Sequence, residues 1–285
     1  MSVSKSHLDV GFGGNVKVET DLKDHHKLSA LLTDIVISDS TGTYHPENLG
    51  ILLAARPDTT YARVQNGNFI VKMDAPGPYD RLFARLGALA DTVGHQMEER
   101  ILDQTMLKEM LPTMRLYVTS GRENAVARFL KASRNITYKE LEADITMSPT
   151  KGVNGQMHVW KLDIDDTLID TVQVTLKDSD HGLTYQARVF NGPKNPLALT
   201  ALLDGHLYEH GARVGLRIFD KEGRVGLRIG TQAAMEPDGM RFTLLPKNPT
   251  IAFREFTLND DNYLFLSNDL HLAAKVEIED RKSVV

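Results

Sequence analysis

The sequence predicts a mainly β fold with a helical insertion, in which a curved antiparallel sheet carries an α-helical block. Apolar and polar residues alternate in short runs over most of the 285 residues, which is the pattern of half-buried strands. Turn residues separate these runs, as expected for hairpins. Between residues 77 and 133 the apolar residues instead fall three or four positions apart, the spacing of a helix face. We therefore divide the chain into an N-terminal β segment (1–76), a helical block (77–133) and a C-terminal β-meander segment (134–285).

The N-terminal β segment contains a strong hairpin signal. Residues 60–65 and 69–73 alternate, and Asn66-Gly67-Asn68 lies between them. Asn and Gly tolerate the positive φ angles that a tight hairpin turn requires. The sequence therefore predicts that these two strands pair.

The helical block is expected to hold three helices. Pro78 suits a first helical turn, where its missing N–H costs nothing. A second helix is predicted over 104–111, because Pro112 ends it. The third is predicted from the capping-box spacing of residues 120–123 and is expected to turn Val126, Phe129 and Leu130 inward. The apolar face of the first helix comprises Tyr79, Leu82, Phe83, Leu86, Leu89, Ala90, Val93 and Met97.

The C-terminal segment contains a short internal repeat. Val214-Gly215-Leu216-Arg217-Ile218 recurs as Val225-Gly226-Leu227-Arg228-Ile229, and the intervening residues 219–224 suit a hairpin loop. We expect the apolar residues of the two copies to share one face, which must be buried against something. Arg217 and Arg228 are expected on the opposite face with solvated guanidinium groups, because burying an unpaired charge is costly. With the next alternating run, the candidate face comprises Val214, Leu216, Ile218, Val225, Leu227, Ile229, Met240, Phe242 and Leu244.

Composition excludes several classes of function. The 33 Lys and Arg against 38 Asp and Glu give a net charge of −5, which argues against a nucleic-acid partner. Cysteine is absent, so thiol catalysis, disulfide frameworks, zinc knuckles and iron–sulfur clusters are excluded. Residues 1–7 have no apolar run, so no signal peptide is expected there. No stretch approaches the ~18 apolar residues of a membrane span.

The sharpest chemical motif is Leu162-Asp163-Ile164-Asp165-Asp166-Thr167-Leu168. It mimics the DxDxT nucleophile loop of haloacid-dehalogenase-type phosphatases, in which the first Asp attacks phosphorus and Mg²⁺ screens the charge. That fold needs strands alternating with helices, whereas the chain that follows this motif alternates like hairpins. We therefore favour an acidic turn between two exposed strand ends over a phosphatase using Asp163 and Asp165.

Two other polar clusters invite a metal interpretation. Asp21, Asp24, His25 and His26 could ligate a cation, but consecutive His side chains point to opposite faces of a strand, so a solvated turn is favoured. Residues 259–262 could supply oxygen ligands to Ca²⁺ but lack the distant Glu, so a hairpin turn is favoured there too. No metal, cofactor or catalytic residue is predicted.

Strand-and-turn signatures spread over most of residues 8–278 carry a resemblance to a known family. They are Tyr44-His45-Pro46-Glu47, Leu53 to Thr60, Gly67 to Val71, Asn195-Pro196, the hairpin Leu216 to Gly230, and Glu255 to Leu266. With these signatures the chain resembles the AsmA/TamB-like (translocation and assembly module) periplasmic envelope proteins of diderm bacteria.

The resemblance implies a U-shaped sheet, or β-taco, with an apolar inner groove that moves phospholipid between the inner and outer membranes. It implies a non-enzymatic protein of outer-membrane biogenesis, located in the periplasm and anchored in the inner membrane. The chain is then expected to be an internal fragment without the anchor and the C-terminal region. Its partners would be phospholipid acyl chains and, through that C-terminal region, outer-membrane assembly proteins. The nine candidate residues would contact lipid.

The residues themselves leave this choice open. Few helices are predicted to cover many apolar strand faces, so a strongly curved sheet must either close as a sandwich or enclose an apolar channel. A lipid conduit, a ligand-free structural or adhesion domain, and the Mg²⁺-dependent phosphatase are the three hypotheses. Copurified lipid would favour the first.

Overall fold

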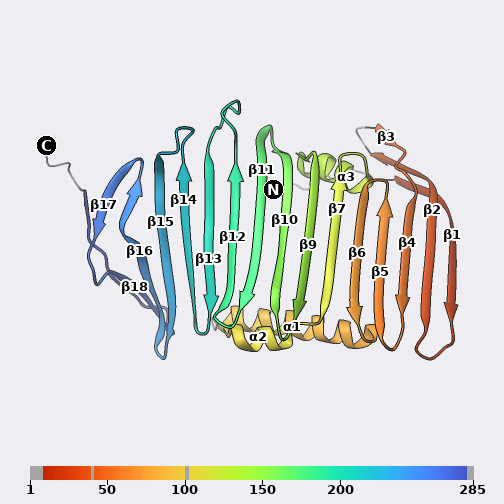
Figure 1. Cartoon of the computed structure of the whole chain (residues 1–285), viewed down its shortest axis with the longest axis horizontal. Coiled ribbons are helices and arrows are strands. Elements are labelled where there is room, and N and C mark those ends of the chain that lie inside the picture. Colours follow the sequence, from red (N-terminus) through yellow and green to blue (C-terminus); the bar gives the residue numbers. More distant parts are fainter. Residues whose placement is uncertain (1–8, 40–41, 100–102, 281–285) are drawn as a thin grey trace. The chain divides into compact units, whose positions relative to one another are not determined.

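The computed structural model describes residues 9–39, 42–99 and 103–280. The segment 1–7, for which no signal peptide is expected, lies outside the described residues. Within them the fold is mainly β, with antiparallel strand pairs and three helices, which confirms the predicted fold class (Figure 1). None of the described helices has the length and apolar character needed to span a membrane.

The helices are α1 (Tyr79–Glu99), α2 (Gln104–Met110) and α3 (Ala125–Arg134). The strands are β1 (Asp9–Thr20), β2 (His26–Asp39), β3 (Gly42–Tyr44), β4 (Leu49–Ala55), β5 (Thr59–Asn66), β6 (Phe69–Pro76), β7 (Met114–Gly121), β8 (Ile136–Thr137), β9 (Glu140–Ser148), β10 (Gly152–Ile164), β11 (Thr167–Ser179), β12 (Gly182–Phe190), β13 (Thr200–Tyr208), β14 (Gly211–Phe219), β15 (Val225–Glu236), β16 (Gly239–Ile251), β17 (Arg254–Leu258), β18 (Tyr263–Ser267), β19 (Leu272–Lys275) and β20 (Ile278–Asp280).

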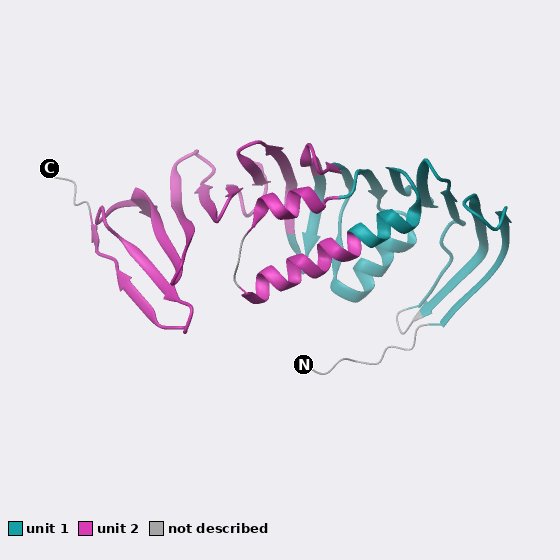
Figure 2. Ribbon diagram, turned by 90° about the horizontal axis from the view of Figure 1, so that it is seen from below, with its two compact units in different colours: residues 1–85, 112–146, 158–167 teal, residues 86–111, 147–157, 168–285 magenta. Residues whose placement is uncertain are grey.

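The chain forms two compact units, coloured separately in Figure 2. Unit 1 comprises residues 1–85, 112–146 and 158–167, and unit 2 comprises residues 86–111, 147–157 and 168–285. Helix α1 and strand β10 contribute residues to both units.

Unit 1 is built on an antiparallel meander of β1, β2, β4, β5, β6 and β7. Leu53 of β4 lies opposite Leu28 of β2 and Ala62 of β5, and Met73 of β6 lies opposite Ala62 and Leu116 of β7. Directly opposed residues of an antiparallel pair share a face. The strands of unit 1 therefore present one continuous apolar face.

The β5–β6 hairpin forms as the sequence predicts. Asn66 lies opposite Phe69, which leaves Gly67 and Asn68 as a two-residue turn. Gly67 has a φ of 57°, in the left-handed region that such a turn requires. A Cβ at this position would also lie 3.0 Å from the Glu123 carbonyl oxygen. Both the positive φ and this close approach therefore favour glycine.

The helical block differs from the prediction in three ways. It contains a strand, β7, between α2 and α3, and the third helix is capped by Asn124 rather than by a capping box at 120–123. Phe129 is 62% exposed instead of facing inward, whereas Ala127 is the buried residue of α3. The second helix ends at Met110, close to the predicted end before Pro112.

Unit 2 is built on the antiparallel meander of β11 to β16. Helix α2 contacts β13, and Lys108 of α2 donates from Nζ to Asp178 Oδ1 of β11 at 2.9 Å and to the Ser179 carbonyl oxygen at 3.1 Å. The Asp178 side chain is 3% exposed, so this is a buried ion pair. It holds α2 against the ends of the strands of this unit.

One predicted turn forms with different pairing. Residues 259–262 connect β17 to β18, but β17 pairs with β16 and β20, and β18 pairs with β16 and β19. The expected hairpin between these two strands is therefore wrong. Asn262 explains the arrangement, because its Oδ1 accepts from the Leu244 backbone N–H at 2.8 Å and fixes the turn to β16.

Candidate functional site

The repeat hairpin forms as β14 and β15, and it brings most of the nine candidate residues together. Leu216 lies opposite Ile229, and Ile218 lies opposite Leu227. The loop between the strands is closed by the Asp220 backbone N–H donating to the Arg224 carbonyl oxygen at 3.0 Å. The register of the strand pair shifts next to Ile218. Val225 therefore lies opposite Phe219, and the regular pairing that places Leu227 opposite Ile218 does not extend to it.

Strand β16 extends this surface on the other side of β15. Met240, Phe242 and Leu244 lie opposite Met235, Ala233 and Thr231 respectively. Because Thr231 and Ala233 follow Ile229 at alternate positions of β15, these residues share the face of Ile229. The structure thus places eight of the nine candidates on one face of unit 2, with Val225 beside the register shift.

The same face continues across β13, β12 and β11, which the candidate set did not include. Leu203 of β13 lies opposite Leu216 and Ala187, and Ala187 lies opposite Val174 of β11. Next to them, Gly205 lies opposite Tyr185 of β12, and a Cβ at Gly205 would collide with the Tyr185 ring at 2.1 Å. Burial on this face raises the pKa of the Tyr185 phenol, with a smaller contribution from the Asp204 charge. The strand alternation that identified the hairpin also marks these residues.

This face is incompletely covered. Leu203 is 37% exposed and Ile229 is 39% exposed. Leu111 and Leu258 are the only buried Ala, Val, Ile, Leu, Met or aromatic residues in the described part of unit 2. A sheet with one apolar face is ordinarily buried by a second layer. The described residues of unit 2 supply little of that layer.

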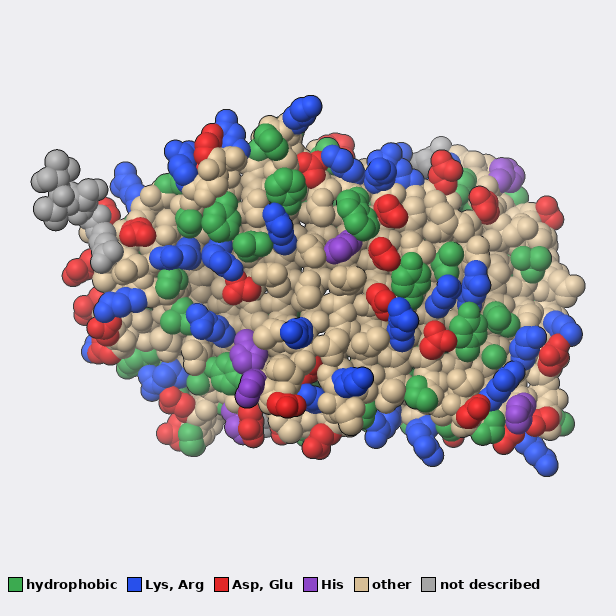
Figure 3. All heavy atoms as spheres, in the orientation of Figure 1, with side chains coloured by type: hydrophobic (Ala, Val, Ile, Leu, Met, Phe, Trp, Pro, Cys, Tyr) green, Lys and Arg blue, Asp and Glu red, His purple; other side chains and the backbone are tan. Residues whose placement is uncertain are grey.

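The opposite face of the β14–β15 hairpin is polar. Arg217 lies opposite Arg228, as predicted, and donates to Asp204 Oδ1 at 2.8 Å. The prediction that both guanidinium groups are solvated is wrong for Arg228. Its Nη2 donates to the Asn248 carbonyl oxygen at 2.7 Å, while its Nε is buried without a hydrogen-bond partner. Figure 3 shows charged side chains of both signs spread over the side of the strands that faces the viewer.

Unit 1 has an apolar hollow where α1 begins. It has a volume of about 360 Å³. His26 of β2 contacts the Tyr79 ring edge-on at 6.0 Å between ring centroids, and its Nδ1 hydrogen-bonds Thr20 Oγ1 at 2.7 Å. The apolar part of the lining consists of Val18, Leu28, Leu53, Ala54, Ala55, Tyr61, Ala62, Met73, Tyr79 and Phe83.

The apolar stripe predicted on α1 is real, but little of it is buried. Leu82 is 5% exposed, whereas Phe83 is 58% exposed and Met97 is 76% exposed. The hollow at Tyr79 and Phe83 therefore adjoins a helix whose apolar side chains remain largely accessible. Sequence periodicity identifies the stripe but not its exposure, because exposure depends on what packs against it.

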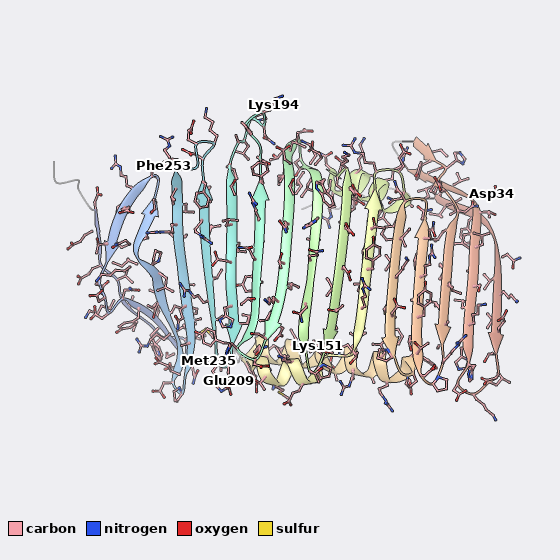
Figure 4. All side chains as sticks on the ribbon, in the orientation of Figure 1. Asp34, Lys151, Lys194, Glu209, Met235 and Phe253 are labelled. Carbon is pink, nitrogen blue, oxygen red and sulfur yellow. The ribbon has the colours of Figure 1, made fainter. Side chains whose placement is uncertain are left out.

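A second cavity in unit 1 lies between α3 and the strands β1, β2 and β3, with a volume of about 600 Å³. Val10 and Ile37, which oppose each other across β1 and β2, form part of its wall. Strand β2 reaches this wall through a register shift near Asp34, which has a φ of 50° and lies within the strand (labelled in Figure 4). Helix α3 contributes Ala125, Arg128, Phe129, Lys131, Ala132 and Asn135 to the lining, the last as its C-cap.

The acidic motif forms the favoured turn. Asp165 and Asp166 have φ angles of 49° and 66° and connect β10 to β11, so a strand follows the motif instead of the helix that a phosphatase loop requires. Asp165 Oδ1 accepts from Asn135 Nδ2 at 3.4 Å. The residues of the motif that would act as nucleophile and acid, Asp163 and Asp165, belong to unit 1.

The cluster at the β1–β2 turn is likewise an ordered turn. Asp21, Asp24 and His25 offer ligand atoms within 4.8 Å of one another, and all three are exposed. Asp21 accepts backbone N–H groups of residues 23, 24 and 25 at 3.0–3.2 Å, which holds the pKa of its carboxyl well below the usual range. His25 Nδ1 hydrogen-bonds both carboxylates, whereas His26 turns to Thr20. These bonds account for the cluster without a cation.

Comparison of the chain with protein-family models, with curated proteins and with solved structures finds no match.

Proposed function

We propose that this chain is a non-enzymatic segment of a cell-envelope protein, of the AsmA/TamB-like kind, whose apolar sheet faces carry phospholipid acyl chains between the inner and outer membranes. The observation that supports this proposal most directly is the apolar face of β11 to β16. It is continuous from strand to strand, yet Leu203 and Ile229 remain partly exposed and unit 2 buries few apolar residues among those described.

Acyl chains have the chemistry that such a face lacks. Each buried CH₂ group contributes about 0.8 kcal/mol, so even part of a chain laid on this face gains several kcal/mol. Hydrophobic contact is non-directional. A lipid on a face of Leu, Ile, Val and Ala therefore meets no single deep energy minimum, which is what movement along the strands requires.

The test is the phospholipid that copurifies with the protein, measured by mass spectrometry per mole of chain. Wild-type protein should carry phospholipid. Ile229→Asp should weaken binding on the face of unit 2 by about tenfold or more, because a carboxylate at this position must be desolvated beneath the acyl chain, and the phospholipid per mole of chain should fall toward what unit 1 alone retains. Ile229 is 39% exposed, so the substitution leaves the strand pairing of β15 in place.

Gln232→Asp is the matched control. It introduces the same carboxylate on the same strand at an exposed position of opposite parity, and should leave the lipid content unchanged. Absence of phospholipid from the wild-type protein, or an equal loss in both variants, contradicts the proposal. In that case a ligand-free structural or adhesion domain is the better description.

A further inference from the structure

We infer that the cavity beneath α3 is a binding site for the headgroup end of an anionic phospholipid, with the phosphate beside Arg128 and Lys131. This inference rests on the proposed lipid-binding function and adds to it a place where one headgroup chemistry is recognised. It concerns unit 1 alone.

The cavity is large enough and has the mixed walls that an amphiphile requires. Its volume of about 600 Å³ falls within the usual range of small-molecule sites, which is roughly 300–1,000 Å³. One wall is apolar, formed by Val10 and Ile37 of the sheet and by Phe129 of α3. Phe129 is 62% exposed and Val10 is 53% exposed, so more than half of each residue is uncovered by the described residues.

The cavity also adjoins the apolar face of unit 1. Val10, Val16 and Val18 are an even number of residues apart on β1, so their side chains lie on one face of the sheet. Val16 lies opposite Ala30 of β2, and Val18 lies opposite Leu28. An acyl chain on the apolar face of unit 1 can therefore end at Val10 and Ile37. The headgroup of that lipid would then lie beneath α3.

The polar side of the cavity is cationic. Arg128 and Lys131 are three residues apart on α3, which places them on one side of the helix. Neither makes an ion pair within the part of the chain that the structure describes. No Asp or Glu occurs among the described lining residues. Asp165, bonded to Asn135, is a carboxylate at the C-terminal end of the helix, so an anion is favoured nearer to Arg128.

Arg128 is held in place by an aromatic ring. Its guanidinium carbon lies 3.9 Å from the centroid of the Tyr44 ring, and Tyr44 also lines the cavity. Stacking of this kind fixes the guanidinium plane while its N–H donors remain available. A planar set of donors suits the paired oxygens of a phosphate diester. Two cations beside an apolar wall, one of them a stacked guanidinium, favour an anionic lipid over a zwitterionic one, whose own ammonium group would be repelled.

The first experiment compares headgroups that share the same acyl chains. The full chain is titrated by calorimetry with dihexanoylphosphatidylglycerol, dihexanoylphosphatidylcholine and glycerol phosphate. We expect the phosphatidylglycerol to bind about fivefold more tightly than the phosphatidylcholine, the ratio for one or two partly exposed charge contacts. Glycerol phosphate, which lacks the chains, should bind most weakly. Equal binding of glycerol phosphate and the anionic lipid would overturn the inference in favour of a bare anion site.

Substitutions in and around α3 test whether the preference for phosphatidylglycerol over phosphatidylcholine arises in this cavity. Arg128→Gln with Lys131→Gln should remove it while leaving the affinity for phosphatidylcholine unchanged. Arg122→Gln with Arg134→Gln is the matched control, because it changes the net charge equally at exposed positions that do not line the cavity. A preference that survives in the first variant, or disappears in the control, overturns the inference.

A cross-linking experiment reports directly where the lipid binds. Phe129→p-benzoylphenylalanine should cross-link phosphatidylglycerol on illumination, whereas Val126→p-benzoylphenylalanine should not, because Val126 is on the same helix but outside the cavity. Binding of both lipids with equal affinity overturns this inference and leaves the proposed function standing. Binding of neither lipid overturns both.

Discussion

The buried ion pair of unit 2 shows how one residue can determine where a helix lies. Asp178 is 3% exposed and Lys108 is 17% exposed, and besides the ion pair each has a second polar contact. Lys108 donates to the Ser179 carbonyl oxygen, and the Asp178 backbone N–H donates to Asn154 Oδ1 at 3.1 Å. The pair also requires a small neighbour, because a Cβ at Gly152 would lie 2.0 Å from an Asp178 oxygen. Two positions distant in sequence, Lys108 and Gly152, therefore depend on one carboxylate.

Lys108→Met should lower the free energy of unfolding by about 3 kcal/mol, because it leaves the Asp178 carboxylate buried without its partner. Urea denaturation monitored by circular dichroism measures this change. Lys247→Met is the control, since Lys247 pairs with Asp260 at 2.5 Å where both side chains are more than half exposed, and should change stability by less than about 1 kcal/mol. Equal effects of the two substitutions would mean that burial of the pair contributes nothing.

At the scale of the element, α3 begins in a polar network. Asn124 is fully buried, its Oδ1 accepts from the Ala127 N–H at 2.8 Å, and its Nδ2 donates to Asn68 Oδ1 and Ser120 Oγ. The next backbone N–H, that of Ala125, donates to Asn66 Oδ1 at 2.7 Å. The start of α3 is thus fixed by the β5–β6 hairpin, far away in sequence.

Asn124→Ala should therefore cost more than an ordinary helix cap. We expect a loss of about 2–4 kcal/mol, because the cap bond disappears and the buried hydroxyl and carbonyl partners lose their donor. Asp103→Ala removes the cap of α2, whose side chain accepts from the Met106 N–H at 2.8 Å, and should cost about 1 kcal/mol. Thermal unfolding measures the loss of stability in each variant. A loss in Asn124→Ala no larger than that in Asp103→Ala would contradict the contribution of the polar network.

These elements also show what the sequence could predict. The β5–β6 hairpin and the β14–β15 hairpin follow from local turn chemistry and alternation, so they were predicted correctly. Strand β7 was missed because it lies between two helices and pairs with β6, which is distant in sequence. The cap of α3 was placed too early because Asn124 gains its role from Asn66 and Asn68 across the fold.

In the candidate face, too, the sequence predicts the features that are set locally and misses those that depend on distant contacts. Alternation along each strand identified eight residues that share a face with their partners, since side-chain direction is a local property. Alternation could not show that Arg228 has a buried Nε, because that depends on Asn248 of β16, which lies where the register of the β15–β16 pair shifts. Nor could it show that Phe129 and Ile229 remain partly exposed, because exposure is set by whichever element packs above them.

At the scale of the whole molecule, the balance between apolar faces and covering elements bears on stability. Unit 1 buries several apolar residues, among them Ile35, Leu82 and Val159, whereas the described part of unit 2 buries Leu111 and Leu258. A ligand that binds the folded state alone stabilises it by mass action, by about 2.7 kcal/mol at a concentration one hundred times its dissociation constant. Acyl chains on the face of unit 2 would supply contacts that its own residues lack.

Removal of bound lipid should consequently lower the melting temperature of the full chain. For a domain of this size about 2.7 kcal/mol corresponds to a shift of roughly 5–10 °C. The measurement is differential scanning calorimetry before and after extraction on a hydrophobic resin, and after dihexanoylphosphatidylcholine is added back. Gln232→Asp should behave like the wild type. Ile229→Asp should show a smaller lipid-dependent shift, since the face of unit 2 no longer accepts an acyl chain while that of unit 1 is unchanged. A melting temperature that is independent of lipid in the wild type would mean that the two units are stable with their apolar faces open to water, and the conduit would lose its energetic basis.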